Sequence, residues 1–197
     1  MNILAIETAT DLSSISLYLK DKVVETFKEK KVISQSKILA TNIDLIIKNN
    51  KVKANDLDAI LLSIGPGSYS GLRVSSSFSK GLAFAINKPI YAINTIDAMN
   101  HSFKDNDNYY IAIYSHRNYV YYQEYIKGEK KGKQYCGQLN NLKDIKIYGY
   151  NLNRISDIKF TDCQPSSLNL INYFFKNKKH LIPKDLIDIN PIYLNKS

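Results

Sequence analysis

The sequence predicts an α/β fold, and three kinds of segment lead to that prediction. Residues 59–64 form a short aliphatic run bounded by turn residues, which is typical of a strand buried in a parallel sheet. Residues 13–20 alternate apolar and polar side chains, as a strand with one buried face does. Residues 34–48 place isoleucine and leucine on one broad side of a helix. Strands and amphipathic helices in this order indicate a sheet that is covered by helices.

The same patterns predict the other elements of the first half. Alternation and short apolar runs extend the first two strands into a three-stranded meander, and two asparagines after Lys48 end the first helix. The expected elements are strands over 2–6, 13–20 and 23–27, a helix from Ser34 or Ser36 to Lys48, a strand over 59–64, a helix over 70–86, a strand over 89–93 and a helix from Thr95.

A glycine-rich elbow, residues 63–73, joins the strand at 59–64 to the following helix. Gly65 and Gly67 permit backbone angles that other residues avoid, and Pro66 fixes the angle between them. Ser68 or Ser70 can cap the helix, whose free amides favour an anion such as phosphate. The spacing of the glycines fits neither the dinucleotide fingerprint nor a Walker A loop. The elbow can therefore be interpreted either as an anion-binding site or as a tight turn that lets the helix pack closely on its strand.

The second half begins with an echo of the first. Residues 110–113, a turn, and residues 119–126 repeat the opening strand, turn and strand, which suggests an internal duplication. The polar segment 105–108 is the natural boundary, so we expect a first lobe over 1–105 and a smaller second lobe over 106–197. The order βββαβαβ followed by a second meander matches the actin-like ATPase (ribonuclease H-like) fold. After residue 127 only a strand near 145–148 and a helix near 168–175 are predicted.

Composition limits the classes of function. The net charge of +9 invites a nucleic-acid role, because a basic surface attracts phosphate backbones. Lysine carries most of that charge in a chain also rich in Asn, Ile and Tyr, residues of A/T-rich codons, so genome composition explains the skew equally well. The interrupted lysine clusters, such as 127–133 and 176–179, are expected in solvated loops or helix ends. A stand-alone RNA-binding module lacks support, since the tyrosines at 109–125 alternate only loosely.

Cysteine usage and hydropathy point to the cytoplasm. Cys136 and Cys163 are far apart and have no Cys-x-x-Cys spacing, so we expect no disulfide. We find no signal peptide and no apolar run of membrane length, and we expect no contact with a membrane.

The set of residues that catalysis would require is incomplete. An actin-like phosphotransferase needs carboxylates after the first strand of both lobes, to hold Mg²⁺ near the phosphates. Glu7 and the turn of Thr8, Thr10 and Asp11 supply one half, whereas Tyr114 stands at the matching position of the second lobe. The isolated histidines His101, His116 and His180 lack the spacing of metal ligands. We therefore assign no catalytic residue and no metal.

Three stretches resemble one family. Gly65-Pro66-Gly67-Ser68-Tyr69-Ser70-Gly71-Leu72-Arg73, followed by Lys80-Gly81-Leu82-Ala83, resembles the signature of the tRNA threonylcarbamoyladenosine biosynthesis protein TsaB, or YeaZ, family. Residues 3–10 resemble that family's opening strand and turn, and residues 191–194 its closing segment. The resemblance is good over residues 1–100 and thins afterwards. Where the family usually has Asp within Asp-Ala-Arg, this chain has Tyr114-Ser115-His116-Arg117.

The resemblance implies the actin-like fold and a noncatalytic role. By this analogy the chain docks on a TsaD-type catalytic subunit, which transfers threonylcarbamoyl to adenosine in tRNA, and forms a homodimer when alone. A TsaE-type ATPase is a further implied partner, and tRNA is reached through the complex. In the family the two helices beside the elbow form a helical bundle with the partner. From helical spacing, the expected docking residues are Ile38, Leu39, Ile46, Ser75, Phe78, Ser79 and Leu82.

The alternative function is a small actin-like ATPase or phosphotransferase that uses Glu7 and the elbow. No cofactor is assigned, and ATP or ADP at a lobe or subunit interface stays open. The candidate nucleotide or anion ligands are Glu7, Thr8, Thr10, Gly65, Gly67, Ser68 and Arg73.

Overall fold

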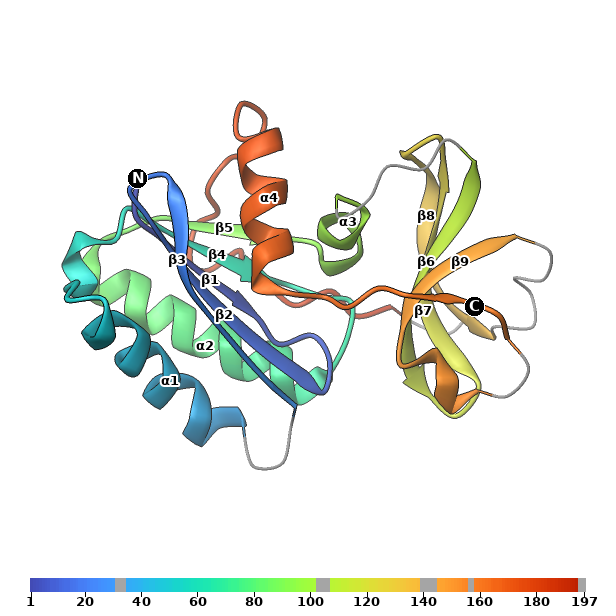
Figure 1. Cartoon of the computed structure of the whole chain (residues 1–197), viewed down its shortest axis with the longest axis horizontal. Helices are drawn as coiled ribbons and strands as arrows, with labels where there is room; N and C mark the ends of the chain where they lie inside the picture. The colour runs from blue at the N-terminus through green and yellow to red at the C-terminus, as the bar shows by residue number, and fades with distance from the viewer. Residues whose placement is uncertain (31–34, 102–106, 139–144, 156–157, 195–197) are drawn as a thin grey trace.

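The computed structural model describes residues 1–30, 35–101, 107–138, 145–155 and 158–194. Two five-stranded sheets lie at the two ends of the molecule, as Figure 1 shows. The first sheet carries long helices, and the second is built mainly of strands. This arrangement confirms the α/β prediction and the two-lobed organisation.

The first sheet has the strand order β3-β2-β1-β4-β5. Antiparallel pairing joins β3 to β2 and β2 to β1, which confirms the predicted meander, whereas β1, β4 and β5 are parallel. Its strands are β1 (Ile3–Glu7), β2 (Leu12–Leu19), β3 (Lys22–Lys30), β4 (Ala59–Ser63) and β5 (Ile90–Ile93). A short 3₁₀ turn, η1 (Ala54–Asp56), precedes β4.

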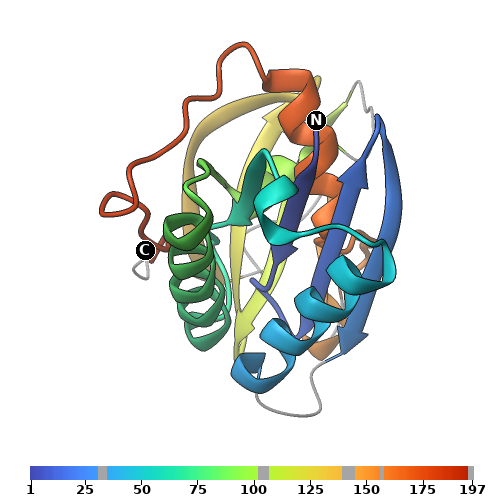
Figure 2. The ribbon, with the colours of Figure 1, turned by 90° about the vertical axis from the view of Figure 1, so that its left-hand side faces the viewer.

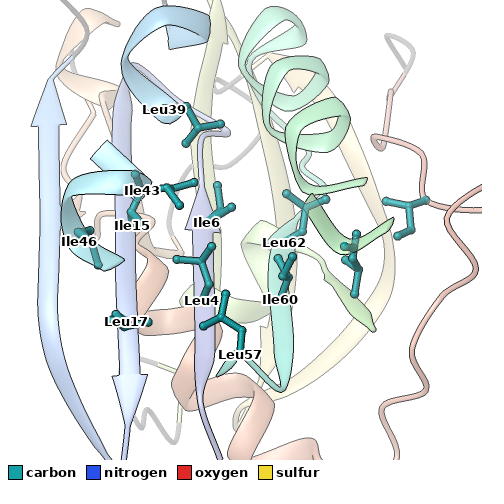
Figure 3. Packing of buried hydrophobic residues seen from close by; sticks show 13 residues of the cluster. Leu4, Ile6, Ile15, Leu17, Leu39, Ile43, Ile46, Leu57, Ile60 and Leu62 are labelled. Atoms are coloured by element: carbon teal, nitrogen blue, oxygen red, sulfur yellow. The ribbon is translucent and has the colours of Figure 1, made fainter. Parts of the chain in front are cut away.

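Helices α1 (Gln35–Asn49) and α2 (Tyr69–Ile86) cover one face of this sheet. Figure 3 shows aliphatic side chains of α1 and of the strands pointing toward one another across the interface. The buried members of this core include Leu4, Ile6, Ile15, Leu17, Leu39, Ile43, Ile46, Leu57, Ile60 and Leu62. Fully burying one such side chain is worth about 1.5–3 kcal/mol, so this layer fixes both helices on the sheet.

Helices α3 (Thr95–Asn100) and α4 (Ser167–Asn177) lie at the opposite face. Phe174 and Leu170 of α4 pack with Ile3 of β1 and Leu61 of β4. The polar side of β2 is covered as well. The Ser167 hydroxyl lies 2.7 Å from the hydroxyls of Ser14 and of Ser16, and all three are buried. The expectation that these serines form the exposed side of a half-buried strand was therefore wrong, because α4 returns from the far end of the sequence to cover them.

The second sheet repeats the topology of the first. Its order is β10-β9-β6-β7-β8, with β6, β7 and β8 antiparallel and β9 and β10 parallel to β6. Its strands are β6 (Asn108–His116), β7 (Tyr119–Ile126), β8 (Glu129–Gln138), β9 (Lys146–Tyr150) and β10 (Thr161–Asp162), with a 3₁₀ turn η3 (Leu152–Arg154). The suggested duplication is thus present in the strand order.

Strand β8 differs from the sequence expectation. Residues 127–133 were expected in loops or helix ends, but Lys130, Lys131 and Lys133 belong to an exposed edge strand. Pairing with β7 holds this strand, since Tyr135 lies opposite Tyr122 across the ladder and their rings stack. Exposed lysines on an edge strand discourage pairing with other chains.

The boundary expected between lobes 1–105 and 106–197 falls within residues 102–106, which lie outside the described residues. The C-terminal segment, however, does not stay in the second lobe. Beyond β10 the chain returns to the first lobe. Besides α4, Lys184 donates its backbone amide to Ile90, and Ile192 donates its amide to Ile64 at 2.7 Å. The first lobe is therefore completed by residues 167–194.

Helix α3 connects the lobes through side chains. The Tyr125 hydroxyl and the Lys130 ammonium of the second sheet both donate to Asp97 at 3.0 Å. Asn94 exchanges hydrogen bonds with Gln134.

None of the helices in the described segments is long and apolar enough to cross a membrane.

Candidate functional site

The elbow between β4 and α2 is packed directly against the turn that follows β1. The amide of Ser68 donates to the carbonyl oxygen of Ala9 at 2.6 Å. A Cβ on Gly67 would lie 2.0 Å from that oxygen and 2.7 Å from the Ala9 Cβ. Ser68 is the helix cap, since its side chain accepts the amide of Gly71 at 3.3 Å. Gly67 therefore serves a close contact between two loops, in agreement with the tight packing turn.

Glu7 lies behind this turn as a buried structural acid. Its Oε1 atom accepts the amide of Ala9 at 2.6 Å and the hydroxyl of Ser63 at 2.8 Å. Burial removes the carboxylate from water and raises the pKa of Glu7 to about 7, although these hydrogen bonds act in the opposite direction. Its side chain is 1% exposed and does not line the cleft described below.

The buried carboxyl makes stability depend on pH. The folded pKa of Glu7 lies above its unfolded value of 4.5, so the folded state binds a proton more tightly. Its stabilising contribution is complete below pH 4.5 and is lost as the pH rises through about 7. Glu7→Gln keeps an oxygen for both hydrogen bonds and cannot ionise. Between pH 4.5 and 8.5, wild-type stability should therefore fall relative to the variant by roughly 3 kcal/mol.

Urea unfolding across that pH range measures this difference. Glu129→Gln, at an exposed position of β8, is the matched control and should run parallel to the wild type. Parallel curves for wild type and Glu7→Gln would show that Glu7 does not titrate on unfolding.

A polar cleft of about 310 Å³ lies between the lobes. It is lined by Ala9, Thr10, Asp11, Gly67, Ser68, Tyr69, Tyr114, Ser115, His116, Tyr121, Asn151 and Arg154. Across it, Asp11 accepts hydrogen bonds from Asn151 at 2.7 Å and from the Arg154 guanidinium at 2.8 Å. The Arg154 guanidinium also lies 5.3 Å from the Tyr114 ring centre. Asp11, an acid of the turn after β1, is thus held by the opposite lobe.

The cleft brings together only part of the predicted anion ligands. Thr10, Gly67 and Ser68 line it, whereas Gly65 packs against Leu72 and the closing segment. Thr8 is buried, and its hydroxyl is hydrogen-bonded to Ser75 at 2.7 Å.

Arg73 also lies away from the cleft. It donates to the Tyr193 hydroxyl at 3.0 Å and stacks 3.9 Å from the Tyr69 ring centre. The closing segment of the sequence therefore binds the elbow, a contact that sequence spacing could not predict. Among the residues that the structure describes, no three His, Cys, Asp or Glu side chains converge as metal ligands would.

The outer surface of α1 and α2 is the second candidate site. Of the seven docking residues expected from helical spacing, Leu39, Ile46, Ser75 and Ser79 are buried within the chain itself. Ile38, Phe78 and Leu82 are half-buried at the edge of that core. A partner can reach only the second group, because contact with the first would require the core to open.

Exposed side chains show what a partner would meet on this surface. Leu45 of α1 is 49% exposed. On α2, Ser77, Gly81 and Ala85 are exposed at intervals of four residues and form one narrow stripe. A Cβ on Gly81 would meet no atom within 4 Å. Neither packing against the described residues nor the backbone geometry of α2 requires a glycine at this position in the middle of the helix.

Comparison with known proteins identifies the family of this chain. A family model described as TsaD, tRNA N6-adenosine threonylcarbamoyltransferase, matches residues 32–143, more than half of the 197 residues. The Buchnera aphidicola tRNA threonylcarbamoyladenosine biosynthesis protein TsaB is 25% identical over 201 aligned residues, covering 95% of this chain and 89% of that protein. The chain belongs to the TsaB/YeaZ family. This confirms the resemblance of the three sequence stretches.

Two further TsaB/YeaZ proteins are similar to this chain, one in sequence and one in structure. Haemophilus influenzae TsaB is 28% identical over 130 residues, which is 64% of this chain and 55% of that protein's length. The chain thus matches about half of that relative and most of the Buchnera one. The solved structure of YeaZ from Pseudomonas aeruginosa superimposes with a TM-score of 0.80 at 19% identity, covering 98% of this chain and 99% of that one. The actin-like fold expected for TsaB/YeaZ proteins is therefore confirmed over nearly the whole chain.

Proposed function

We propose that this chain is a noncatalytic partner subunit in the formation of threonylcarbamoyladenosine in tRNA. It docks on a TsaD-type catalytic subunit through the outer side of α1 and α2, and it reaches tRNA through that subunit. Kinship with proteins described as taking part in tRNA threonylcarbamoyladenosine biosynthesis supports the pathway. The exposed stripe on α2 supports the docking surface.

The observation that carries the docking proposal is Gly81. Glycine in a helix interior costs about 1 kcal/mol relative to alanine. No contact among the described residues offsets that cost, since the space above Gly81 is open. A second helix that crosses α2 at Gly81 would approach closely and contact Ser77 and Ala85 on either side. Half-buried Phe78 and Leu82 would then be covered completely, with exposed Leu45 at the border.

The cleft offers less support for the alternative of an ATPase. Glu7 is buried behind the turn and Arg73 is bound to Tyr193, so neither is directed at a ligand in the cleft. Asp11 already bonds Arg154. A nucleotide in the cleft would have to break that ion pair before it could approach the turn.

The complete assembly includes a TsaE-type ATPase and works in the cytoplasm. In the absence of the catalytic subunit, two copies of this chain pair through the same helices. The homodimer and the complex therefore exclude one another, because both cover Gly81.

Co-purification tests this function. The tagged chain should retain the TsaD-type subunit of its host when the two are expressed together, and the isolated chain should form a dimer by sedimentation. Added catalytic subunit should convert the dimer into the heteromeric complex. Failure to retain the subunit, under conditions in which both proteins are folded, would contradict the proposal.

A further inference from the structure

Three large hydrophobic side chains, one at the end of α2 and two in the C-terminal segment, are mostly exposed to water. Ile187 is 88% exposed, Phe84 80% and Ile182 78%, the highest values for large hydrophobic side chains in the described part of the chain. Single exposed hydrophobic residues are common on protein surfaces, but large ones in or next to an apolar groove mark a binding surface.

Phe84 lines a groove with a volume of about 480 Å³. Ile182 and Ile187 stand directly before and after the four residues, 183–186, that form another part of its lining. Its walls are the end of α2, the start of β5 and a part of the C-terminal segment that runs beside α2 in Figure 2. The apolar lining comes from Ala83, Phe84, Pro89, Ile90, Pro183 and Leu186.

The wall formed by the C-terminal segment is fixed in place. Lys184 donates its amide to the Ile90 carbonyl oxygen at 3.0 Å. Leu186 packs against the core under α1 and α2, and Ile189 is buried in it. The groove is therefore preformed and needs no ordering of its own chain before it binds a ligand.

The groove continues the docking surface of α2. Phe84 follows Gly81 by less than one helical turn, and both are exposed on the outer side of the helix. A partner helix that crosses at Gly81 therefore passes close to Phe84, at the rim of the groove.

Charge indicates what kind of segment the groove fits. Lys88 and Lys184 line it against a single acid, Asp185. Two ammonium groups against one carboxylate leave the lining net positive, which favours a segment that carries carboxylates. An apolar segment flanked by carboxylates would bury its side chains on Phe84 and pair with both lysines.

We propose that this groove receives an apolar, carboxylate-flanked segment of the same catalytic subunit that docks on α1 and α2. The inference rests on the proposed function and adds a second anchor to it. The first anchor is a close helix crossing at Gly81, and the second is an apolar segment held between α2 and residues 183–186.

Affinity for the purified TsaD-type subunit of the host tests the second anchor. Phe84→Ser combined with Ile187→Ser should weaken binding at least about tenfold while leaving the fold intact, since both side chains lie in water. Lys184→Glu should also weaken binding, and that effect should shrink at high salt. Leu168→Ser, at an exposed position of α4, is the control and should bind like the wild type.

The outcomes separate the two proposals. If the double variant binds normally while Gly81→Arg does not bind, the groove proposal is overturned and the docking surface stands. If Gly81→Arg also binds normally, or if the wild type does not bind the subunit, the proposed function fails and the groove proposal with it. If the double variant weakens only self-association in sedimentation, the occupant is a second copy, which also overturns the groove proposal.

Discussion

Replacing Gly81 with Arg is expected to abolish binding of the catalytic subunit without unfolding the chain. The position is exposed, and a Cβ there meets nothing within 4 Å, so the long side chain projects into water. Arginine also favours a helix over glycine by nearly 1 kcal/mol. In the complex the same side chain would occupy the space of the partner helix. We expect at least about a hundredfold loss of affinity, the size of a strong interface hot spot, in a titration with the purified subunit.

Two controls make this result specific. Gly81→Ala should raise the free energy of unfolding by about 0.5–1 kcal/mol and leave binding nearly intact, because a methyl group is small. Asn172→Arg adds the same charge at an exposed position of α4, on the other face of the sheet, and should bind normally. Normal binding by Gly81→Arg would remove α2 from the interface.

Replacing Gly67 with Ala should affect the stability of the fold rather than binding, and the loss of stability should be large. The added methyl carbon would lie 2.0 Å from the Ala9 carbonyl oxygen and 2.8 Å from its carbonyl carbon, and these backbone atoms cannot move alone. The elbow must separate from the turn after β1, which also breaks the hydrogen bond from the Ser68 amide to Ala9. Overpacking together with this lost bond should cost about 3 kcal/mol or more in urea unfolding.

Gly128→Ala is the comparison for Gly67. Gly128 has φ +84° but open space around it, so only backbone strain opposes a methyl group there. We expect that variant to lose about 1 kcal/mol. If both alanine variants lose the same small amount, the contact between elbow and turn is not a rigid part of the fold.

The elements that could be predicted are those whose signals are local. The aliphatic run at 59–64 and the glycines after it specified β4 and the start of α2, since turn residues and buried strands are visible in a short window. The strand echo after residue 108 likewise indicated the second sheet.

Side-chain roles depended on contacts that the local pattern does not contain. Helical spacing grouped Leu39 and Ile46 with Ile38. It could not predict that Leu39 and Ile46 are buried against the sheet whereas Ile38 is only half-buried at the edge of the core. Ser75 seemed suited to a partner by its small size, whereas its hydroxyl is bonded to Thr8 inside the chain.

Other features could not be predicted because they depend on pairing between residues far apart in the sequence. Strand β8 has a lysine-rich sequence with little hydrophobic alternation, and its position is set by hydrogen bonds to β7. The serine cluster joins residues 14 and 16 of β2 to residue 167 of α4, so it cannot be predicted from the sequence of either segment alone. The candidate cleft depended on Asp11 and Arg154 meeting across the lobes, a contact between residues far apart in the sequence.

Formation of threonylcarbamoyladenosine in tRNA is the direct measure of whether this chain acts as a docking partner. Host TsaD-type and TsaE-type subunits, with their small-molecule substrates, would be incubated with tRNA in the presence of wild-type chain, Gly81→Arg or Asn172→Arg. Wild type and Asn172→Arg should support accumulation of the modified nucleoside, and Gly81→Arg should leave it at the level seen without the chain. Equal modification in all four reactions, including the one that lacks the chain, would contradict the role as a docking partner.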